Sequence, residues 1–349
     1  MRAVDLRSDT TTLPTDEMRQ AIAGAELGDD VFQGDPTVNR LQDLAAQRMG
    51  KEAALLVPSG TMANLASILT HCGRGAEVIL GNRAHTYKYE KGGISAYGGI
   101  HSTQILNQND GTMRLEDIRA AIRGKDDHFP VTSLICLENT HNVCGGAPLS
   151  VTYTKEVADL ARAHNIKMHI DGARIFNAAV AQGVDVQELV EDADSVSFCM
   201  SKGLGAPVGS VICGSKDFID QARGIRKGLG GGMRQAGIIA AAGIVALETM
   251  VDRLQEDHTN ARLLAEGIAD LPDVILDPET IKTNIIYFDL DNSAIESADF
   301  LTVLTAKGIQ FFDTGPRRFR MVTHNDISAE DVLYTIESFK STLTTDSAP

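Results

Sequence analysis

Between residues 50 and 215, short apolar runs alternate with amphipathic stretches. The runs have strand length, and we predict strands at 53–57, 77–80, 132–137, 166–170, 195–199 and 210–213. Apolar positions in 62–70 and 155–163 recur with helical spacing. Strands that alternate with helices form a mainly parallel sheet with helices on both faces. This part of the chain therefore predicts an α/β fold.

The pattern changes near residue 250. Residues 233–254 are Ala-rich and periodic, which predicts one long helix that is buried on much of its surface. Further on, we predict strands at 283–290 and 318–322, helices at 298–306 and 329–339, and a disordered tail at 344–349. We therefore expect an N-terminal arm and large domain in residues 1–250 and a smaller C-terminal α+β domain in residues 251–349.

Composition and charge narrow the class of protein. The chain has 349 residues, of which 43% are hydrophobic, so it can bury a large core. The net charge of −15 argues against nucleic acid or an anionic membrane as partner. No apolar stretch is long enough for a membrane helix. These features predict a soluble protein, in which local basic pockets could still bind small anions.

The five cysteines are odd in number and lack the spacing of metal ligands, so we expect no metal site. Cys136, Cys199 and Cys213 lie within apolar runs, which predicts buried, reduced thiols. The first residues contain no apolar leader segment. We therefore expect the protein in the cytoplasm.

Two charged residues each follow a predicted buried strand. Asp171 ends the run at 166–170, and Lys202 comes shortly after the run at 195–199. Ligands of open α/β sheets bind at these strand ends. A lysine able to form a Schiff base and a carboxylate for a pyridinium nitrogen are what pyridoxal phosphate (PLP) requires from a protein. Taken alone, the pair could equally be two unrelated surface charges.

Neighbouring residues favour the cofactor interpretation. Ser59, Gly60 and Thr61 lie between a strand and a helix, where backbone N–H groups and hydroxyls can bind a phosphate. The alternative is an ordinary helix cap. Ser201 adds a hydroxyl beside the lysine, whose burial would lower its pKa and favour the neutral amine. Arg174 could reach the ring hydroxyl of the cofactor or a substrate carboxylate.

Histidine and arginine supply further candidates. His85 follows a predicted strand and could stack on a cofactor ring or carry a proton, although a loop histidine often has no role. His128 is a weaker candidate of the same kind. Arg320 and its neighbours could bind an α-carboxylate or simply be solvated. The glycine loop at 228–232 neither follows a strand nor fits G-x-G-x-x-G, which excludes a nicotinamide dehydrogenase.

Together these segments resemble the threonine aldolase family, which has the aspartate-aminotransferase-like fold of PLP enzymes, fold type I. The resemblance covers nearly the whole chain. It rests on the order and spacing of runs that begin at Asp5, Gly28, Asp35, Pro58, Leu137, Asp171, Ser201, Gly230 and Arg320. Any one run is modest support, whereas their common order is specific.

The resemblance implies a role for each matching residue. Lys202 would hold PLP, Asp171 would pair with its ring nitrogen and His85 would stack on its ring. The phosphate would be surrounded by Ser59, Gly60, Thr61 and Ser201, with Arg234 reaching it from a neighbouring subunit. Ser8, Arg174 and Arg320 would bind the substrate carboxylate. His85 and His128 are the candidates for the base at the β-hydroxyl.

The implied reaction is reversible cleavage of L-threonine, L-allo-threonine or a related β-hydroxy-α-amino acid, such as phenylserine, to glycine and an aldehyde. The enzyme would be a homo-oligomer, a tetramer or dimer with shared active sites. Residues 31–36 lack the tyrosine and glutamate usual in the family, and 142–146 contain glycines where relatives vary, so the preferred substrate is open. The alternatives are another PLP enzyme of this fold (a β-eliminating lyase, racemase or aminotransferase) and a non-catalytic binding protein.

Overall fold

The computed structural model describes residues 3–291 and 295–344, so nearly all of the predicted tail lies outside the described residues. The larger sheet has seven strands in the order β2-β8-β7-β6-β5-β3-β4. They are β2 (Ala53–Val57), β3 (Glu77–Gly81), β4 (His101–Ile105), β5 (Thr132–Glu138), β6 (Lys167–Asp171), β7 (Ser195–Cys199) and β8 (Ser210–Gly214). Only β8 runs antiparallel to its neighbours. The predicted mainly parallel sheet is confirmed.

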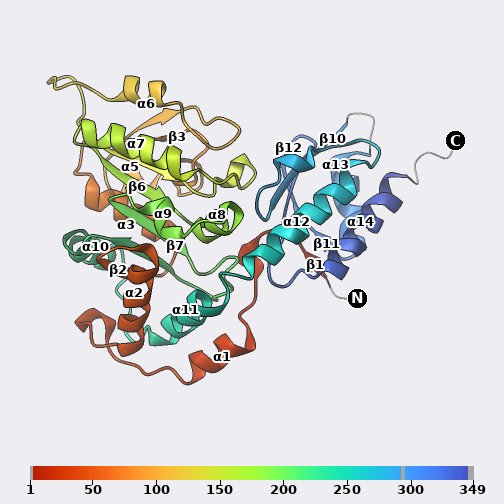
Figure 1. Cartoon of the computed structure of the whole chain (residues 1–349), viewed down its shortest axis with the longest axis horizontal. Helices are drawn as coiled ribbons and strands as arrows, with labels where there is room; N and C mark the ends of the chain where they lie inside the picture. The colour runs from red at the N-terminus through yellow and green to blue at the C-terminus, as the bar shows by residue number, and fades with distance from the viewer. Residues whose placement is uncertain (1–2, 292–294, 345–349) are drawn as a thin grey trace.

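Helices cover both faces of this sheet (Figure 1). Against one face pack α2 (Pro36–Met49), α6 (Leu115–Ala121), α7 (Val151–Ala163), α8 (Ile175–Gln182), α9 (Val186–Val190) and α11 (Gly237–Thr249). Against the other pack α3 (Gly60–His71), α5 (Gly93–Ala96) and α10 (Lys216–Gly228). Two further helices are α1 (Asp16–Ala23), which packs against α11, and α4 (His85–Lys88), which contacts α3. Alternate residues of each strand therefore enter different cores, as the two-residue period of a strand requires.

A second group of elements forms its own core. A four-stranded antiparallel sheet has the order β12-β13-β10-β9, and a two-stranded parallel sheet joins β1 to β11. The strands are β1 (Val4–Asp5), β9 (Val274–Ile275), β10 (Ile285–Leu290), β11 (Ile309–Gln310), β12 (Phe312–Gly315) and β13 (Arg318–Val322). The helices are α12 (Leu254–Ala269), α13 (Ser297–Ala306) and α14 (Ala329–Leu343). Figure 1 shows α12 leading from the larger group into this one.

The N-terminal segment packs with the second group, although it comes first in the sequence. Leu6 is fully buried in the second core, and its carbonyl accepts a hydrogen bond from the Val322 amide. The division of the chain near residue 251 stays a prediction. The structure adds that residues 4–6 join elements more than 250 residues away.

The long helix predicted at 233–254 is wrong in extent. The chain is helical in α11, turns at 250–253, and starts α12 at Leu254. Neither Gly nor Pro lies in residues 250–253, so the local sequence gives no clear signal for the turn. Val251 and Leu254 still pack on the larger core, whereas Leu264 packs on the second. The break lets the chain pass from one core to the other.

Within the residues that the structure describes, no helix is long and apolar enough to cross a membrane. All five cysteines are free, and the three predicted to be buried are buried.

Candidate active site

Several of the predicted site residues lie at the carboxyl edge of the parallel strands. Asp171 is the last residue of β6, Lys202 follows β7, and His85 opens α4 just after β3. Ser59 lies between β2 and α3, where its side chain caps the helix. Because β2, β3, β6 and β7 all point the same way, these residues share one edge of the sheet.

Asp171 is buried within a hydrogen-bonded cluster. Its Oδ2 accepts a hydrogen bond from Asn64 Nδ2 at 2.8 Å, and the same amide donates to Glu90 Oε1 at 2.9 Å. His85 Nδ1 lies 2.8 Å from that Glu90 oxygen. Ligating atoms of His85, Glu90 and Asp171 all lie within 4.8 Å of one another. One asparagine therefore holds two buried carboxylates beside one imidazole.

The carboxylates make His85 more basic. Burial alone would lower its pKa, but the hydrogen bond to Glu90 and the charge of Asp171 outweigh burial and raise it. With Nδ1 donating to Glu90, the neutral ring has a lone pair on Nε2. The His85 amide also donates to Glu138 Oε2 at 2.7 Å, which fixes the start of α4. His85 is therefore oriented from both its ring and its backbone.

Arg174 makes a bidentate ion pair with Asp9, and both side chains are buried. Arg174 Nε and Nη2 each lie 2.7 Å from an Asp9 oxygen. Burial would raise the pKa of Asp9, but Arg174 outweighs it and holds that pKa well below its usual range. The charges of Lys202 and Arg320 lower it further, so these cations lie near the same carboxylate. Among the described residues, Arg174 Nη1 has no hydrogen-bond partner and is left for a ligand.

Arg320 is a buried cation without a carboxylate partner in the described part of the chain. Its Nη2 donates to Asn142 Oδ1 at 3.0 Å and its Nη1 to the Arg7 carbonyl at 3.3 Å. Its buried Nε has no hydrogen-bond partner. Burial and the nearby charge of Arg174 both lower the pKa of Arg320. A bound carboxylate would offset both the burial of this charge and its repulsion by Arg174.

Lys202 is half-buried and lies in a tight loop. Within the described residues, its Nζ makes no hydrogen bond or ion pair. The loop closes through a hydrogen bond from the Gly205 amide to the Lys202 carbonyl at 2.8 Å. Gly205 has a φ of +77°, which a residue with a Cβ rarely adopts. The half-buried Ser201 precedes the lysine in this loop.

The first turn of α3 supplies free backbone N–H groups beside two hydroxyls. Ser59 Oγ accepts a hydrogen bond from the Met62 amide at 3.2 Å, and the Thr61 side chain is exposed. Gly60 packs directly on the end of β7, where an added Cβ would meet Cys199 Sγ at 2.7 Å. Ser59 is therefore a helix cap, and binding of an anion at this helix start stays a prediction.

Three predicted residues have other surroundings within one chain. Ser8 caps a short 3₁₀ helix, η1 (Asp9–Thr11), one residue before the buried carboxylate of Asp9. Arg234 is exposed and pairs with Asp29 at 2.9 Å. The His128 side chain is 87% exposed and pairs with Asp126, in the loop that leads to the amino end of β5. A single chain therefore does not bring His128 to the carboxyl edge.

Sequence reasoning missed the residues that orient the site. Asn64, Glu90 and Glu138 contact the predicted residues, and Asp9 neutralises Arg174 across 165 positions. One signal was available: Asp9 and Glu138 lie in the runs that carry the family resemblance. Asn64 and Glu90 gave none, because a polar residue on a helix or in a loop is usually solvated.

Comparison with known proteins shows which family this chain belongs to. Residues 5–291 match the family described as beta-eliminating lyase. Low-specificity L-threonine aldolase 1 of Arabidopsis thaliana is 50% identical, over 100% of this chain and 99% of that protein. The low specificity L-threonine aldolase of Escherichia coli K12 is 44% identical, over 94% of this chain and 96% of that protein. The structure of Leishmania major threonine aldolase has a TM-score of 0.83 at 16% identity, over 97% of this chain and 99% of that chain.

Proposed function

We propose a function from one premise: the chain belongs to the beta-eliminating lyase family and, within it, to the L-threonine aldolases. It is a PLP-dependent lyase that cleaves L-threonine and L-allo-threonine to glycine and an aldehyde. The single observation that carries this function is that Lys202 and Asp171 lie at one edge of the larger sheet, while Arg320, from β13, lies near the same Asp9 carboxylate as Lys202. The predicted fold class and activity are confirmed by the comparisons.

The residues present fit PLP. Asp171 is a buried carboxylate that accepts hydrogen bonds only from neutral donors, Asn64 and the Ala173 amide, among the described residues, so it can pair with a protonated ring nitrogen. The open N-terminus of α3 can take the phosphate, with Ser59, Gly60, Thr61 and Ser201 around it. When bound through Lys202, PLP serves as a sink for the electron pair left on Cα.

The arginines orient the substrate. Arg320 and the free Nη1 of Arg174 can bind the α-carboxylate, with Ser8 beside them. Fixing the carboxylate sets the rotation about the bond from Cα to nitrogen, and so selects which bond at Cα breaks. Asp9 and Asn142 hold the two guanidinium groups in place.

The β-hydroxyl proton has to leave as the Cα–Cβ bond breaks. We propose His85 Nε2 as its acceptor, directly or through a water, because Glu90 holds the ring with that nitrogen free. His128 remains the alternative, and it can act only if another subunit carries its loop to the site. His85 also presents a ring face for stacking.

The loop at 142–146, which departs from the family pattern, can account for a broad range of substrates. Val143, Cys144 and Gly145 line a cavity of about 550 Å³ together with Tyr287 and Arg318. Asn142, at the start of this loop, donates its backbone N–H to Glu138 and accepts from Arg320. We propose that the substrate side chain points toward this cavity, which has room for the aryl group of phenylserine.

We also propose a homo-oligomer, a dimer or tetramer, with active sites shared between subunits. Arg234 and His128 are exposed in one chain. Phe32 is 79% exposed and lies three residues after Asp29, the ion-pair partner of Arg234. A partner would cover such a side chain. Mixing inactive Lys202→Ala with inactive Arg234→Ala subunits should restore activity if one site uses both residues. The cytoplasmic location stays a prediction, which the free thiols support.

The experiment that tests the activity is aldehyde release from L-threonine, L-allo-threonine and phenylserine. We expect release from at least one substrate, and its loss in Lys202→Ala. Lys216→Ala is the matched control, because the side chain of that lysine is exposed and pairs with Asp220. A PLP-loaded protein that releases no aldehyde would contradict the proposal, and product analysis would then separate elimination, racemisation and transamination.

A further inference from the structure

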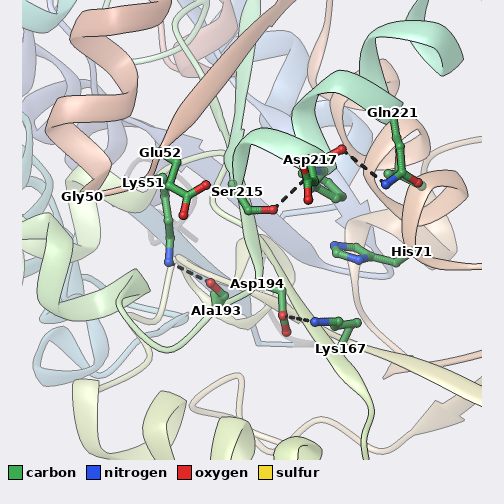
Figure 2. A pocket seen from close by; sticks show the side chains of 13 residues that line it. Gly50, Lys51, Glu52, His71, Lys167, Ala193, Asp194, Ser215, Asp217 and Gln221 are labelled. Carbon is green, nitrogen blue, oxygen red and sulfur yellow. Dashed lines mark hydrogen bonds and ion pairs between the residues drawn. The ribbon is translucent and has the colours of Figure 1, made fainter.

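A second pocket lies at the opposite edge of the larger sheet (Figure 2). It has a volume of about 570 Å³ and is bordered by the first residue of β6, Lys167. Figure 2 shows the His71 ring and the Lys51 amine on opposite sides of it. The His71 ring stacks on Phe218 with 4.4 Å between the centroids. His71 is the last residue of α3, the helix whose first turn faces the active site.

Hydrogen bonds lead from this pocket to Asp171 through the interior. His71 Nε2 lies 2.7 Å from Ser195 Oγ, which lies 2.8 Å from His169 Nδ1. His169 Nε2 lies 3.4 Å from Asn64 Oδ1, and the Asn64 amide donates to Asp171. His169 and Ser195 are fully buried. Residues 169 and 195 are partners in register on β6 and β7, on the face covered by α3. This series of hydrogen bonds therefore runs along the interface between α3 and the sheet.

The donor and acceptor atoms allow the hydrogen bonds from His71 to Asp171 to run in only one direction. Asn64 donates through Nδ2 to two carboxylates, so its Oδ1 must accept from His169 Nε2. Burial lowers the pKa of His71 to about 4 and that of His169 to about 3, so each neutral ring has one N–H at pH 7. His169 Nδ1 then accepts from Ser195 Oγ, and Ser195 Oγ accepts from His71 Nε2. Every donor points toward Asp171.

We propose that His169 and His71 are positioning residues: through Ser195 they orient the Asn64 amide, and this amide holds Asp171 and Glu90 for the cofactor ring. This rests on the proposed function, because Asp171 is taken as the partner of the ring nitrogen. A reversed Asn64 amide would direct its oxygen at two carboxylates, which disfavours the ionised form of Asp171. Ser197 Oγ also donates to Asn64 Oδ1, at 2.9 Å, so the loss of His169 should weaken this orientation without abolishing it.

Variants of His169 can test the chain. His169→Phe keeps the ring volume but removes both hydrogen bonds, whereas His169→Gln offers an amide donor to Asn64 and an acceptor to Ser195. His258→Phe is the matched control. This buried histidine lies on α12, forms a hydrogen bond with Asn177, and takes no part in the hydrogen bonds from His71 to Asp171. We expect PLP to bind apo His169→Phe about tenfold more weakly, the difference that one lost hydrogen bond makes. His169→Gln should stay within about twofold of the wild type, and His258→Phe should bind normally.

A second measurement needs only the unsubstituted protein. Nitrogen-15 NMR of labelled histidines should show His71 and His169 neutral at pH 7, each with its proton on Nε2. Signals are identified by their loss in His71→Phe and His169→Gln. A proton on Nδ1 of His169, or a charged ring, would overturn the direction of the chain and with it the proposal.

The two measurements separate this proposal from the function. If the wild type fails to bind PLP, the proposed function falls while the histidine tautomers can still be read. If the wild type binds PLP and His169→Phe binds it equally well, with an unchanged absorption band of the bound cofactor, the positioning role is wrong although the enzyme assignment stands.

Discussion

Glu90 lies against His85, and its charge sets how readily that imidazole takes up a proton. A base must be unprotonated to act, so activity should fall as the pH falls through the pKa of His85. Because the Glu90 carboxylate helps to raise this pKa, a neutral side chain at position 90 lowers it.

We therefore expect Glu90→Gln to move the acid side of the pH–rate profile to lower pH. The measurement is aldehyde release against pH for the variant and the wild type. Glu116→Gln is a suitable control, since this exposed carboxylate lies on α6. An acid limb that stays in place would argue that His85 is not the base and would favour His128.

The ion pair of Asp9 and Arg174 should contribute strongly to stability. Asp9→Asn leaves a buried guanidinium with its main partner neutralised, which typically costs about 3–5 kcal/mol. Asp220→Asn breaks an exposed pair with Lys216 and should cost less than about 0.5 kcal/mol. Urea unfolding of both variants measures the difference.

The same pair gives a pH dependence with a defined sign. The folded protein holds the pKa of Asp9 below its unfolded value of about 3.9. The contribution of Asp9 is therefore complete above about pH 4 and is lost as the pH falls through the folded pKa. In Asp9→Asn, stability should decline less steeply below pH 4; an equal decline would show that other carboxylates cause it.

Helix starts show how capping residues acquire tertiary roles. Asp35 caps α2 by accepting hydrogen bonds from the Thr37 and Val38 amides, and Pro36 follows it at the first helical position. Its other oxygen accepts from the Gly28 and Gly237 amides, so one carboxylate joins α2 to the start of α11. This residue is fully buried.

Asp35→Ala should therefore cost more than an ordinary cap. Loss of a single cap costs about 1 kcal/mol, which we expect for Ser215→Ala at the start of α10. Asp35→Ala also leaves buried amides without partners, so we expect a loss above about 3 kcal/mol. Thermal unfolding compares the two variants, and equal losses would contradict the joining role of Asp35.

At the element scale, the strands were the most predictable part. The predicted strands at 53–57, 195–199 and 318–322 have the observed bounds, because buried runs are short and clearly delimited. α1, α2 and α10 carry caps that a closer reading of the chain could have used. The short strands β1, β9 and β11 have two residues each, which is too few to show a period.

At the scale of the whole molecule, the N-terminal residues pack in the second core, although the rest of that core comes from the C-terminal part of the sequence. Leu6 lies between β11 and β13, whereas Leu13, seven residues later, is 62% exposed. Leu6→Ala should cost about 2–5 kcal/mol because it opens a cavity in a closed core. Leu13→Ala should change stability by less than about 0.5 kcal/mol. Chemical unfolding of both variants tests whether the arm is a structural part of this core.

Local sequence patterns were enough to predict the sheet and the edge at which the predicted site residues lie, and a lysine and a carboxylate at that edge indicated the cofactor. The alternation of side chains between the two faces of a strand and the length of a strand are both local properties of the sequence. A residue that follows a buried parallel strand must lie at the carboxyl end of that strand. Lys202, Asp171 and His85 could therefore be placed from their positions along the chain. Matching runs supplied the residues, such as Arg320, that no local rule identifies.

The partners of these residues could not be predicted, because they depend on contacts between distant segments. The pairing of Asp9 with Arg174, the path from His71 to Asn64, and the contact of Leu6 with β13 each join segments far apart in sequence. A polar residue in a strand, such as His169 or Ser195, shows only that it alternates with apolar neighbours. Whether it meets water or a buried partner depends on which helix covers that face, and packing of the whole chain sets that choice.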